Sequence, residues 1–438
     1  MLEAINYIET ANRHSLGVVL PLAERIAGRL REFGLADKID ICGSLRRRKD
    51  TIGDMDLLAV SDEPEHLMDI FTSLEFVEKV LVKGATKTSV IVSPGIQVDL
   101  RVVSRDSYGS ALQYFTGSKQ HNIELRSLAK SLGYKLSEYG LFKGSTCIAG
   151  REEVDIYKAL GLSYIVPEMR EARGEIELAT NHNLPKLVEP SDIKGDLHLH
   201  STWSDGSATI EDLARKAIEL GYSYIAITDH CGRLKIAGAL SSSELKQQWK
   251  EIDKLNKKLA PFRILKGVEI EISITGELSL PLEFLKQLDI VIASVHTGLK
   301  HTKEEMTRRI CRAMENPYVT VIAHPTGRLL GKRPGYELAM DTVFKKAAET
   351  GTLLEINAHP LRLDLNDVYA FDAKKFTLLV IDTDSHTLAG MDNMRYGLFM
   401  ARRAWCSPSH ILNTFSLNKL LNWLSKPKKQ RLALLSQT

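Results

Sequence analysis

Between residues 195 and 386 the chain repeats a short, apolar, β-branched run that ends in a histidine or a carboxylate. In chain order the runs are GDLHLH, YIAITDH, ILKGVEI, DIVIASVH, TVIAHP, LLEINAHP and TLLVIDTDSH. Runs of this length and composition are typical of buried strands. Segments with a helical pattern, such as ATIEDLARKAIELGY and DTVFKKAAETG, separate most of them. The repeat therefore predicts seven parallel strands joined by crossovers.

A ring of parallel strands places the C-terminal end of every strand on one face, where such barrels hold their active sites. Seven of the thirteen histidines lie at or just past these strand ends. In an extended chain His198 and His200 point the same way, so they can share one ion. Two polar residues on a solvated strand are the alternative for this pair taken alone. The recurrence of the pattern favours a shared metal site.

The length of 438 residues exceeds what one core usually serves, so two domains are expected. A net charge of +3 is too small to indicate a nucleic-acid partner by itself, although basic residues cluster at 46–49 and at 426–431. The five cysteines form no CxxC pair, and the sequence shows no signal peptide and no apolar run that could span a bilayer. These features favour a reducing cytoplasm and no membrane association.

A different pattern precedes the repeats. Residues 1–33 are predicted to be helical, with Pro21 tolerated in a first turn. The segment IDICGSLRRRKDTIGDMDLLAV predicts a strand, a Gly-Ser turn, a basic loop and a second strand, and TSVIVSPGIQVDLRVV predicts a hairpin with a Ser-Pro-Gly turn. Asp54 and Asp56 project from one face of their strand, and Asp99 of the hairpin could lie beside them.

Three carboxylates on one sheet face repel one another unless cations lie between them. All-oxygen ligation suits Mg²⁺, and two such ions can activate an attacking hydroxyl and stabilise a leaving pyrophosphate. Gly43 lets the chain approach a phosphate closely, and the Ser44 hydroxyl can hydrogen-bond it. This combination predicts phosphoryl-transfer chemistry, which an isolated Asp-x-Asp would not.

Residues 43–140 resemble the palm and nucleotide-binding part of the X family of DNA polymerases, the family of polymerase beta. GSLRRRKDTIGDMD matches the Gly-Ser and paired-aspartate motif, QVDLRVV the third-aspartate strand, and ALQYFTGSKQHNIELRSLAKSLGYKLSEYG the YFTGS segment with its following helix. The resemblance implies that the catalytic, Mg²⁺-binding residues are Asp54, Asp56 and Asp99. It implies that the triphosphate is held by Gly43, Ser44 and Arg47.

The same resemblance assigns nucleotide contacts to the YFTGS segment. Tyr114, Phe115 and Gly117 would pack against the incoming sugar, while Asn122 and Arg126 would face the nascent base pair. An aromatic face suits the sugar, a glycine permits close approach and an arginine matches phosphate charge. A buried Tyr-Phe pair beside a turn is the alternative if the aspartates are disregarded.

Residues 195–386 resemble the polymerase-and-histidinol-phosphatase (PHP) domain that bacterial X-family polymerases, known as PolX, carry at their C-terminal end. All positions of that domain's metal pattern are filled, by His198, His200, Asp205, His230, Glu269, His296, His324, Asp384 and His386. The resemblance implies a distorted (β/α)7 barrel with two or three metal ions that acts as a 3′–5′ exonuclease. Mixed imidazole and carboxylate ligation suits Mn²⁺, Zn²⁺ or Fe²⁺ better than Mg²⁺, and such ions can activate water for attack on phosphorus.

Other polar residues lie close to these positions. Asp229 is expected to orient an imidazole, and His359 is expected to lie outside the ligand set. Arg328 and Arg333 lie on a Gly-rich loop just after His324. We interpret them as a phosphate clamp for the DNA backbone, with a plain solvated loop as the alternative.

The expected fold is therefore an α/β multidomain chain, with a polymerase beta-like palm and thumb followed by a PHP barrel. The expected domains are a nucleotidyltransferase (1–150), the end of the polymerase module with a linker (151–193), the PHP domain (194–405) and a helical tail of unassigned role (406–438). Family members normally begin with a longer helical region carrying helix-hairpin-helix DNA grips. No Gly-x-Gly hairpin precedes Gly43, so we expect a weaker grip on DNA and no lyase activity.

The leading expectation for function is a DNA repair enzyme that combines nucleotidyl transfer with 3′–5′ exonuclease activity. Its partners would be gapped or 3′-ended DNA and dNTPs, in a bacterial cytoplasm near the nucleoid, with no obligate protein partner. One alternative keeps only the PHP phosphoesterase, with the shortened polymerase module as a DNA-binding platform. Others are a non-catalytic DNA-end binder and a nucleotidyltransferase acting on RNA or small molecules.

Overall fold

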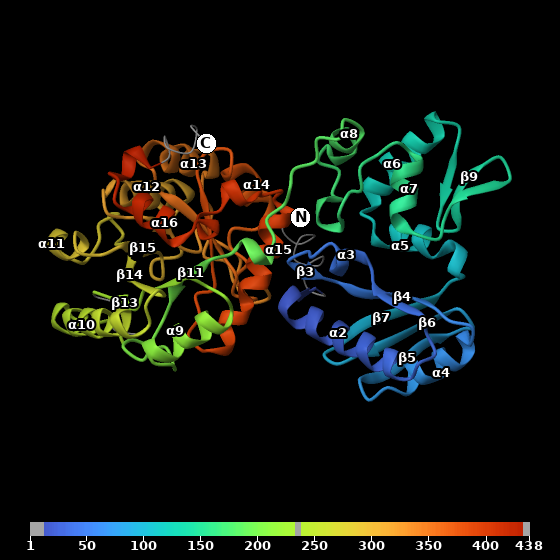
Figure 1. Ribbon diagram of the computed structural model, residues 1–438, viewed down its shortest axis with the longest axis horizontal. Helices are drawn as coiled ribbons and strands as arrows, with labels where there is room; N and C mark the ends of the chain where they lie inside the picture. Colours follow the sequence, from blue (N-terminus) through green and yellow to red (C-terminus); the bar gives the residue numbers. More distant parts are fainter. Residues whose placement is uncertain (1–12, 233–237, 432–438) are drawn as a thin grey trace. The chain divides into compact units, whose positions relative to one another are not determined.

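The computed structural model describes residues 13–232 and 238–431 (Figure 1). The chain forms two compact units that meet in sequence between Pro185 and Lys186. This point falls inside the segment expected to end the first module and begin a linker. Residues 1–12 of the predicted N-terminal helices and residues 432–438 of the predicted tail lie outside the described residues.

The first unit is built on a mixed sheet. In sheet order its strands are β2 (Lys38–Ile41), β4 (Asp54–Val60), β7 (Ile96–Val102), β6 (Lys87–Val92) and β5 (Val77–Lys83). β4 and β7 run parallel, and the other neighbouring pairs run antiparallel. The hairpin of β6 and β7 is therefore confirmed, with the Ser-Pro-Gly turn between its strands.

Helices cover this sheet on both faces. α2 (Leu16–Glu32) and α4 (Pro64–Ser73) pack on one side, as Figure 1 shows. On the other side Leu58 and Val60 of β4 pack against Tyr108 and Leu112 of α5 (Tyr108–Thr116). Side chains alternate along a strand, so even-numbered residues of β4, the paired aspartates included, share the face that α5 covers.

Two local predictions in this unit were wrong. Pro21 lies inside α2 and not in its first turn, because the helix already begins at Leu16. Proline has no N–H to donate to the carbonyl four residues earlier, so α2 lacks one hydrogen bond there. The predicted Gly-Ser turn is instead the start of a short helix, α3 (Gly43–Arg46). A short ladder of β1 (His14–Ser15) with β3 (Thr51–Ile52) holds the loop that follows α3.

The rest of the first unit is a helical layer and a small antiparallel sheet. Its helices are α6 (Lys119–Ser131), α7 (Glu153–Ala159) and α8 (Glu175–Thr180). Its strands are β8 (Lys135–Ser137), β9 (Gly140–Lys143) and β10 (Thr146–Ala149). Glu153 of α7 forms buried ion pairs with Arg46 and Arg170, which tie α3 to this layer.

The second unit is a ring of parallel strands, as the repeat predicted. In sheet order they are β11 (Gly195–Leu199), β12 (Tyr224–Ile227), β14 (Arg263–Glu271), β15 (Ile290–Ser294), β16 (Val321–Ile322), β17 (Leu353–Asn357) and β18 (Leu379–Asp382). The ring nearly closes where the His200 N–H donates to the Ser385 carbonyl at 2.9 Å. The YIAITDH run also supplies a short extra strand, β13 (His230–Cys231), which pairs with β14.

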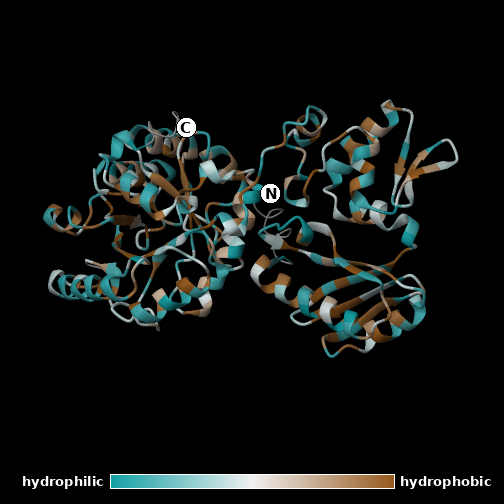
Figure 2. Cartoon of the chain, viewed as in Figure 1, coloured by the Kyte–Doolittle hydropathy of each residue, from teal (hydrophilic) through white to brown (hydrophobic). Residues whose placement is uncertain are grey.

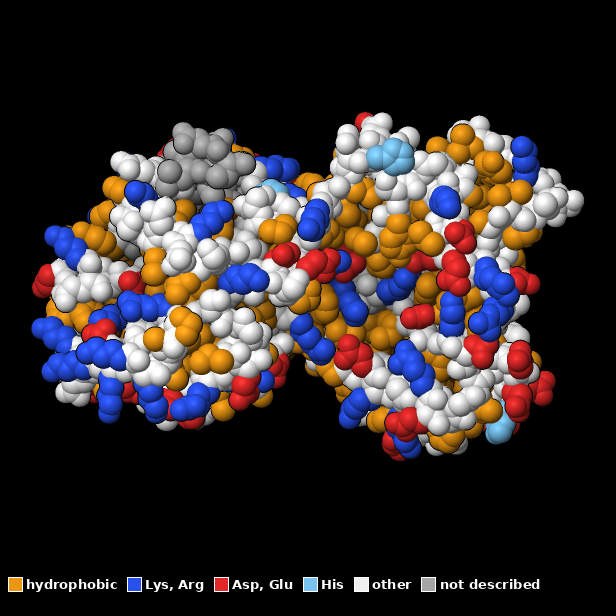
Figure 3. Space-filling model, viewed as in Figure 1, with side chains coloured by type: hydrophobic (Ala, Val, Ile, Leu, Met, Phe, Trp, Pro, Cys, Tyr) orange, Lys and Arg blue, Asp and Glu red, His pale blue; other side chains and the backbone are white. Residues whose placement is uncertain are grey.

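Helices surround this barrel (Figure 1). They are α9 (Ile210–Glu219), α10 (Ser242–Lys258), α11 (Leu282–Leu285), α12 (Lys303–Glu315), α13 (Met340–Thr350), α14 (Asp367–Ala373) and α15 (Met394–Arg403). Thr209, Ser241 and Thr302 cap α9, α10 and α12 through reciprocal bonds with an acidic residue three positions later. Figure 2 shows the hydrophilic outer face of α10, and Figure 3 shows basic side chains at the same edge of the molecule.

The C-terminal segment closes the N-terminal end of the barrel. It contains α16 (Leu417–Leu424), and Leu412, Phe415 and Trp423 join the apolar barrel core. The Asn413 amide donates to the carbonyls of Gly195 and Ile381, near the N-terminal end of β11 and in β18. The tail therefore covers the end of the barrel opposite to the C-terminal ends of its strands. In the described parts of the chain, no helix has the length and apolarity needed to cross a bilayer.

Candidate active sites

The barrel brings all of its predicted metal ligands together at the C-terminal ends of the strands. Among the described residues they form overlapping groups in which the potential ligand atoms lie within 4.8 Å of one another. One group is His200, Asp205, His230 and His386; the next is His198, His200, Glu269 and Asp384; the last is Glu269, His296 and His324. His200 and Glu269 belong to two groups each, so the ligand set is continuous.

Strand register explains this gathering. His198 and His200 leave β11 on the same side, and their ring centroids are 5.1 Å apart. His230 of β13 lies directly opposite Glu269 of β14. Asp205 lies on the loop after β11, and the other four ligands follow the ends of β15, β16 and β18. The His386 ring stacks on that of His200, with ring centroids 4.1 Å apart. A parallel barrel carries all of these chain positions to one rim.

The donors fit divalent metal ions. Nε2 of His198, both ring nitrogens of His200 and Nδ1 of His324 are buried and form no hydrogen bond with any residue that the structure describes. His200 Nε2 lies 3.4 Å from Glu269 Oε2 and 3.3 Å from Asp384 Oδ1. Buried polar atoms without partners are costly, and a bound cation would satisfy nitrogens and carboxylates together. The mixed nitrogen and oxygen set matches Mn²⁺, Zn²⁺ or Fe²⁺.

The protonation states of two buried imidazoles agree with this role. Burial lowers the pKa of His200 to about 4 and the pKa of His324 to about 4. Both rings are therefore neutral near pH 7, as a metal ligand must be. Burial also disfavours the charged form of His198, but the nearby carboxylates of Asp384, Glu269 and Glu355 raise its pKa well above the usual value.

Sequence reasoning missed the carboxylates that hold these rings. Glu355 of β17 accepts a hydrogen bond from His198 Nδ1 at 2.7 Å and another from the His324 N–H. Glu271 of β14 lies 3.0 Å from Nδ1 of His296. Such partners fix the orientation of a metal-binding imidazole. The signal that could have revealed them was a glutamate inside an apolar strand run, in LLEINAHP and again in ILKGVEIE.

The polar side chains near this site have varied roles. Asp229 accepts hydrogen bonds from Ser201, Ser204 and Gln248, so among the described residues it anchors the loop after β11 and orients no imidazole. That prediction was wrong because its carboxylate faces α10. His359 lies outside the ligand groups. Arg362, which the sequence did not indicate, places its Nε atom 3.5 Å from Asp384 Oδ2.

The proposed phosphate-clamp arginines brace their own loop. Arg328 donates to the carbonyls of Arg362 and Leu363, and Arg333 donates to the carbonyl of Gly327. Arg333 is exposed, whereas Arg328 is partly buried.

In the first unit the three predicted aspartates lie on adjacent strands. Asp56 of β4 is directly opposite Asp99 of β7. Asp54 lies two residues before Asp56, so its side chain is on the same face of β4. Burial, followed by the charges of Asp54 and Asp99, raises the pKa of Asp56 to about 6. This mutual repulsion marks a place for cations, and donors that are all oxygen suit Mg²⁺.

These aspartates are less tightly gathered than the barrel ligands. They do not form one of the groups with ligand atoms within 4.8 Å that the described residues contain. Asp99 is held by Gln97 Nε2 at 2.9 Å and by Lys87 Nζ at 3.0 Å. Burial opposes ionisation of Asp99, but these bonds lower its pKa below the usual value.

Gly43 fits beside Asp56 because it has no side chain. Its φ of +62° lies in the left-handed region, and a Cβ atom there would be 2.7 Å from Asp56 Oδ2. Ser44 follows in the first turn of α3 and is partly exposed. Arg47 donates to the Thr116 carbonyl and lies 3.0 Å from Glu171, so it joins α3 to the YFTGS segment.

The predicted nucleotide contacts lie together around the junction of α5 and α6. Tyr114 and Phe115 are partly exposed, with ring centroids 5.2 Å apart in an edge-to-face arrangement. Gly117 follows with a φ of +66°. Asn122 donates to the Tyr114 carbonyl at 2.7 Å, and the exposed Arg126 donates to the carbonyl of Asn122.

Comparison with known proteins gives similarities in both units. A family model described as DNA polymerase beta thumb matches residues 111–171, and a model described as PHP domain matches residues 196–359. The chain is 40% identical to the DNA polymerase/3′-5′ exonuclease PolX of Bacillus subtilis (strain 168), over 94% of this chain and 73% of that protein.

Other relatives match a smaller part of this chain. A probable phosphatase of Thermoanaerobacter sp. (strain X514) is 30% identical over 54% of this chain and 96% of its own length. The repair DNA polymerase X of African swine fever virus is 31% identical over 31% of this chain and 83% of its own length.

Proposed function

The chain belongs to the PolX family of DNA polymerases, and from that membership we propose that it is a DNA repair enzyme with two separate metal-dependent sites. One site extends a DNA 3′ end with dNTPs, and the other degrades a 3′ end by hydrolysis. The observation that carries the proposal is the continuous cluster of histidines and carboxylates in the barrel, several of whose buried nitrogens have no hydrogen-bond partner among the described residues. A structural relic would not keep such a costly arrangement.

In the barrel, one set of residues would bind the metal ions and another set orients the metal-binding imidazoles. The ligands would be His198, His200, Asp205, His230, Glu269, His296, His324, Asp384 and His386, and two or three Mn²⁺, Zn²⁺ or Fe²⁺ ions bound there would activate water and neutralise phosphate charge. Glu355 and Glu271 keep the His198 and His296 rings in place. Arg362, beside Asp384, supplies a guanidinium at the edge of the site that suits a phosphate oxygen.

In the first unit Asp54, Asp56 and Asp99 would hold Mg²⁺, which would activate the primer hydroxyl and stabilise the leaving pyrophosphate. Gly43, Ser44 and Arg47 would bind the triphosphate. The aromatic pair Tyr114 and Phe115, with Gly117, would contact the sugar, and Asn122 and Arg126 would face the base pair. The partly exposed aromatic rings and the exposed Arg126 support these roles.

The partners in this proposal are gapped or 3′-ended DNA and dNTPs, without an obligate protein partner, near the bacterial nucleoid in the cytoplasm. Arg333 is the better candidate for a phosphate contact on the 327–333 loop, because it is exposed. Arg328 would support the same loop through its carbonyl contacts. The alternative, a hydrolase with an inactive polymerase module, is disfavoured by the register that brings Asp56 opposite Asp99.

Reciprocal substitutions test the two-site proposal. Asp99→Ala should abolish extension of a gapped primer by dNTPs and Mg²⁺ while sparing degradation of a labelled 3′ end with Mn²⁺. His198→Ala should do the reverse, because the two side chains belong to different compact units. Equal loss of both activities in both variants, with folding intact by circular dichroism, would reject separate sites. Degradation without measurable extension in the unaltered chain would support the hydrolase-only alternative.

A further inference from the structure

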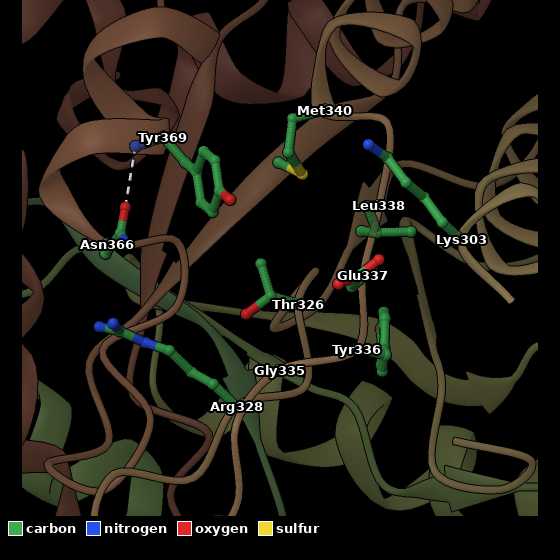
Figure 4. Close-up of a pocket in the computed structure, with 10 residues that line it drawn as sticks. All are labelled: Lys303, Thr326, Arg328, Gly335, Tyr336, Glu337, Leu338, Met340, Asn366 and Tyr369. Atoms are coloured by element: carbon green, nitrogen blue, oxygen red, sulfur yellow. Dashed lines mark hydrogen bonds between the residues drawn. The ribbon is translucent and has the colours of Figure 1, made fainter. Parts of the chain in front are cut away.

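A pocket of about 390 Å³ opens in the barrel, and among its lining residues the function proposed above uses only Arg328 (Figure 4). Its walls include Thr326, Tyr336, Leu338, Met340, Asn366 and Tyr369. They come from the start of α13, the start of α14 and the loop between β16 and α13. The volume is at the small end of ligand pockets and suits one small molecule or one residue of a polymer.

The pocket lies on the metal-binding side of the barrel. α13 follows β16 and α14 follows β17, so the first turns of both helices lie at the C-terminal ends of the strands. Thr326 is two residues after the ligand His324, which limits the separation of their Cα atoms to about 7 Å. A group bound in the pocket is thus within reach of a phosphate at the metal ligands.

One wall of the pocket is held to the loop that follows the metal ligand His324. The Tyr336 N–H donates a hydrogen bond at 3.0 Å to the carbonyl of Thr326, which lies two residues after the ligand His324. The Tyr336 ring also lies against Gly327, where a Cβ atom would be 2.5 Å from it. Tyr336 is therefore held against the loop that follows His324.

The pocket has the chemistry of a nucleoside site. Thr326 Oγ1 is buried in the pocket wall beside Asp364, which accepts a hydrogen bond from the Thr326 N–H. Figure 4 shows Thr326 in the middle of the pocket, with Tyr336 on one side and Tyr369 on the other. Leu338 and Met340 add apolar surface, and Lys303, Arg328 and Glu337 add charged groups to the lining. A flat heterocycle matches aromatic and apolar walls with a few hydrogen-bonding groups.

We propose that this pocket binds the base and sugar of the 3′-terminal nucleotide whose phosphodiester is cleaved at the barrel's metal site. The inference rests on the hydrolase function proposed above and specifies how that site recognises its substrate. Thr326 donates or accepts a hydrogen bond with the nucleoside, and the tyrosine and aliphatic side chains contact the base.

Two phosphodiesters that differ by a nucleoside test this inference. Bis(4-nitrophenyl) phosphate has none, whereas thymidine 5′-(4-nitrophenyl phosphate) has one and releases the same chromophore. Leu338→Trp should fill the pocket and raise KM for the thymidine ester at least ~10-fold, leaving kcat/KM for the simple diester within about twofold. Thr326→Val keeps the shape and removes the hydroxyl, so a loss of about 3- to 10-fold is expected for the thymidine ester alone.

The matched control is Val368→Trp, which adds the same indole to α14 at a position that is 51% exposed and outside the pocket. It should leave both substrates unaffected. If Leu338→Trp slows both esters equally, or neither, the nucleoside subsite is rejected.

A binding measurement separates this inference from the hydrolase function. Thymidine 5′-monophosphate should bind the full chain and the Val368→Trp variant in calorimetry with Mn²⁺, and bind Leu338→Trp at least ~10-fold more weakly. This result would support the pocket even if the unaltered chain hydrolysed neither ester, in which case only the hydrolase proposal fails. Equal affinity in all the variants would overturn the pocket assignment even if hydrolysis is observed.

Discussion

At the scale of single residues, Gly43 leaves room for the Asp56 carboxylate because it has no side chain. Its backbone is left-handed, and the space that a Cβ atom would need is taken by Asp56 Oδ2. Gly43→Ala should therefore cost about 1–2 kcal/mol in backbone strain and displace the Asp56 carboxylate. We expect extension of a primer to fall at least ~10-fold while degradation of a 3′ end is unchanged.

Gly28 provides the control for that substitution. It lies in α2, and among the described residues no atom outside the neighbouring helix backbone lies within 4 Å of the place that an added methyl group would occupy. Gly28→Ala should stabilise the protein by up to about 1 kcal/mol in urea unfolding, because alanine favours the helix. If Gly43→Ala leaves the rate of primer extension unchanged, the extension reaction does not depend on the present position of the Asp56 carboxylate.

Glu355 acts through the residues it holds. Its carboxylate bonds Nδ1 of His198 and the backbone of His324. Glu355→Gln keeps the volume but weakens these bonds, so Mn²⁺ affinity measured by calorimetry should fall about 10- to 100-fold. Glu349→Gln makes the same chemical change at an exposed position of α13 and should leave the affinity unaltered. Equal affinities for the two variants would contradict the role of Glu355.

At the scale of elements, a buried ion cluster joins α3 to α7. Glu153 pairs with Arg46 at 2.8 Å and with Arg170 at 2.6 Å. Glu153→Gln would leave two largely buried guanidinium groups without their counter-charge, a loss of about 3–5 kcal/mol in urea unfolding at pH 7. Glu152→Gln, one residue earlier, breaks a mostly exposed pair with Lys38 and should cost at most about 1 kcal/mol.

This contribution of Glu153 should depend on pH in one direction. Burial opposes its ionisation, but Arg170 and Arg46 outweigh burial and lower the pKa of Glu153 far below its usual value. A carboxylate with a lowered folded-state pKa stabilises the protein above its unfolded pKa of about 4.3, and that stability is lost as the pH falls. The difference between the unaltered chain and Glu153→Gln should thus be largest at neutral pH and shrink below about pH 4. A difference that grows on acidification would contradict this assignment.

At the scale of the whole molecule, metal binding should stabilise one unit more than the other. Most of the barrel ligands are buried, and several of their nitrogens have no hydrogen-bond partner among the described residues, so ions bound there should stabilise the folded barrel by about 2.7 kcal/mol at 100 times Kd. For a unit of this size, chelation should lower the corresponding Tm by roughly 5–10 °C in calorimetry. His198→Ala should have the lowered Tm already and should respond little to a chelator. If chelation lowered the Tm of both units equally, the metal ions would not stabilise the barrel specifically.

Much of the architecture could be predicted from the sequence because it depends on short-range patterns. The alternating β-branched runs predicted the parallel barrel, and the side-chain alternation of His198 with His200 and of Asp54 with Asp56 predicted their shared faces. Errors arose where local pattern was weak. The helix that begins at Gly43 is a single turn, and Asp229 forms its bonds with Gln248 on a distant helix.

The sequence alone determined the ligand types and the strand ends that carry them, since both follow from residue identity and the two-residue period of a strand. Only the tertiary structure decided which donors meet. Closure of the barrel brings His198 beside Asp384, 186 positions later, and Glu355 behind His198. It also decided that Thr326, Tyr336 and Asn366 enclose one pocket. Contacts between distant segments depend on how strands close and helices pack, and no local periodicity records that geometry.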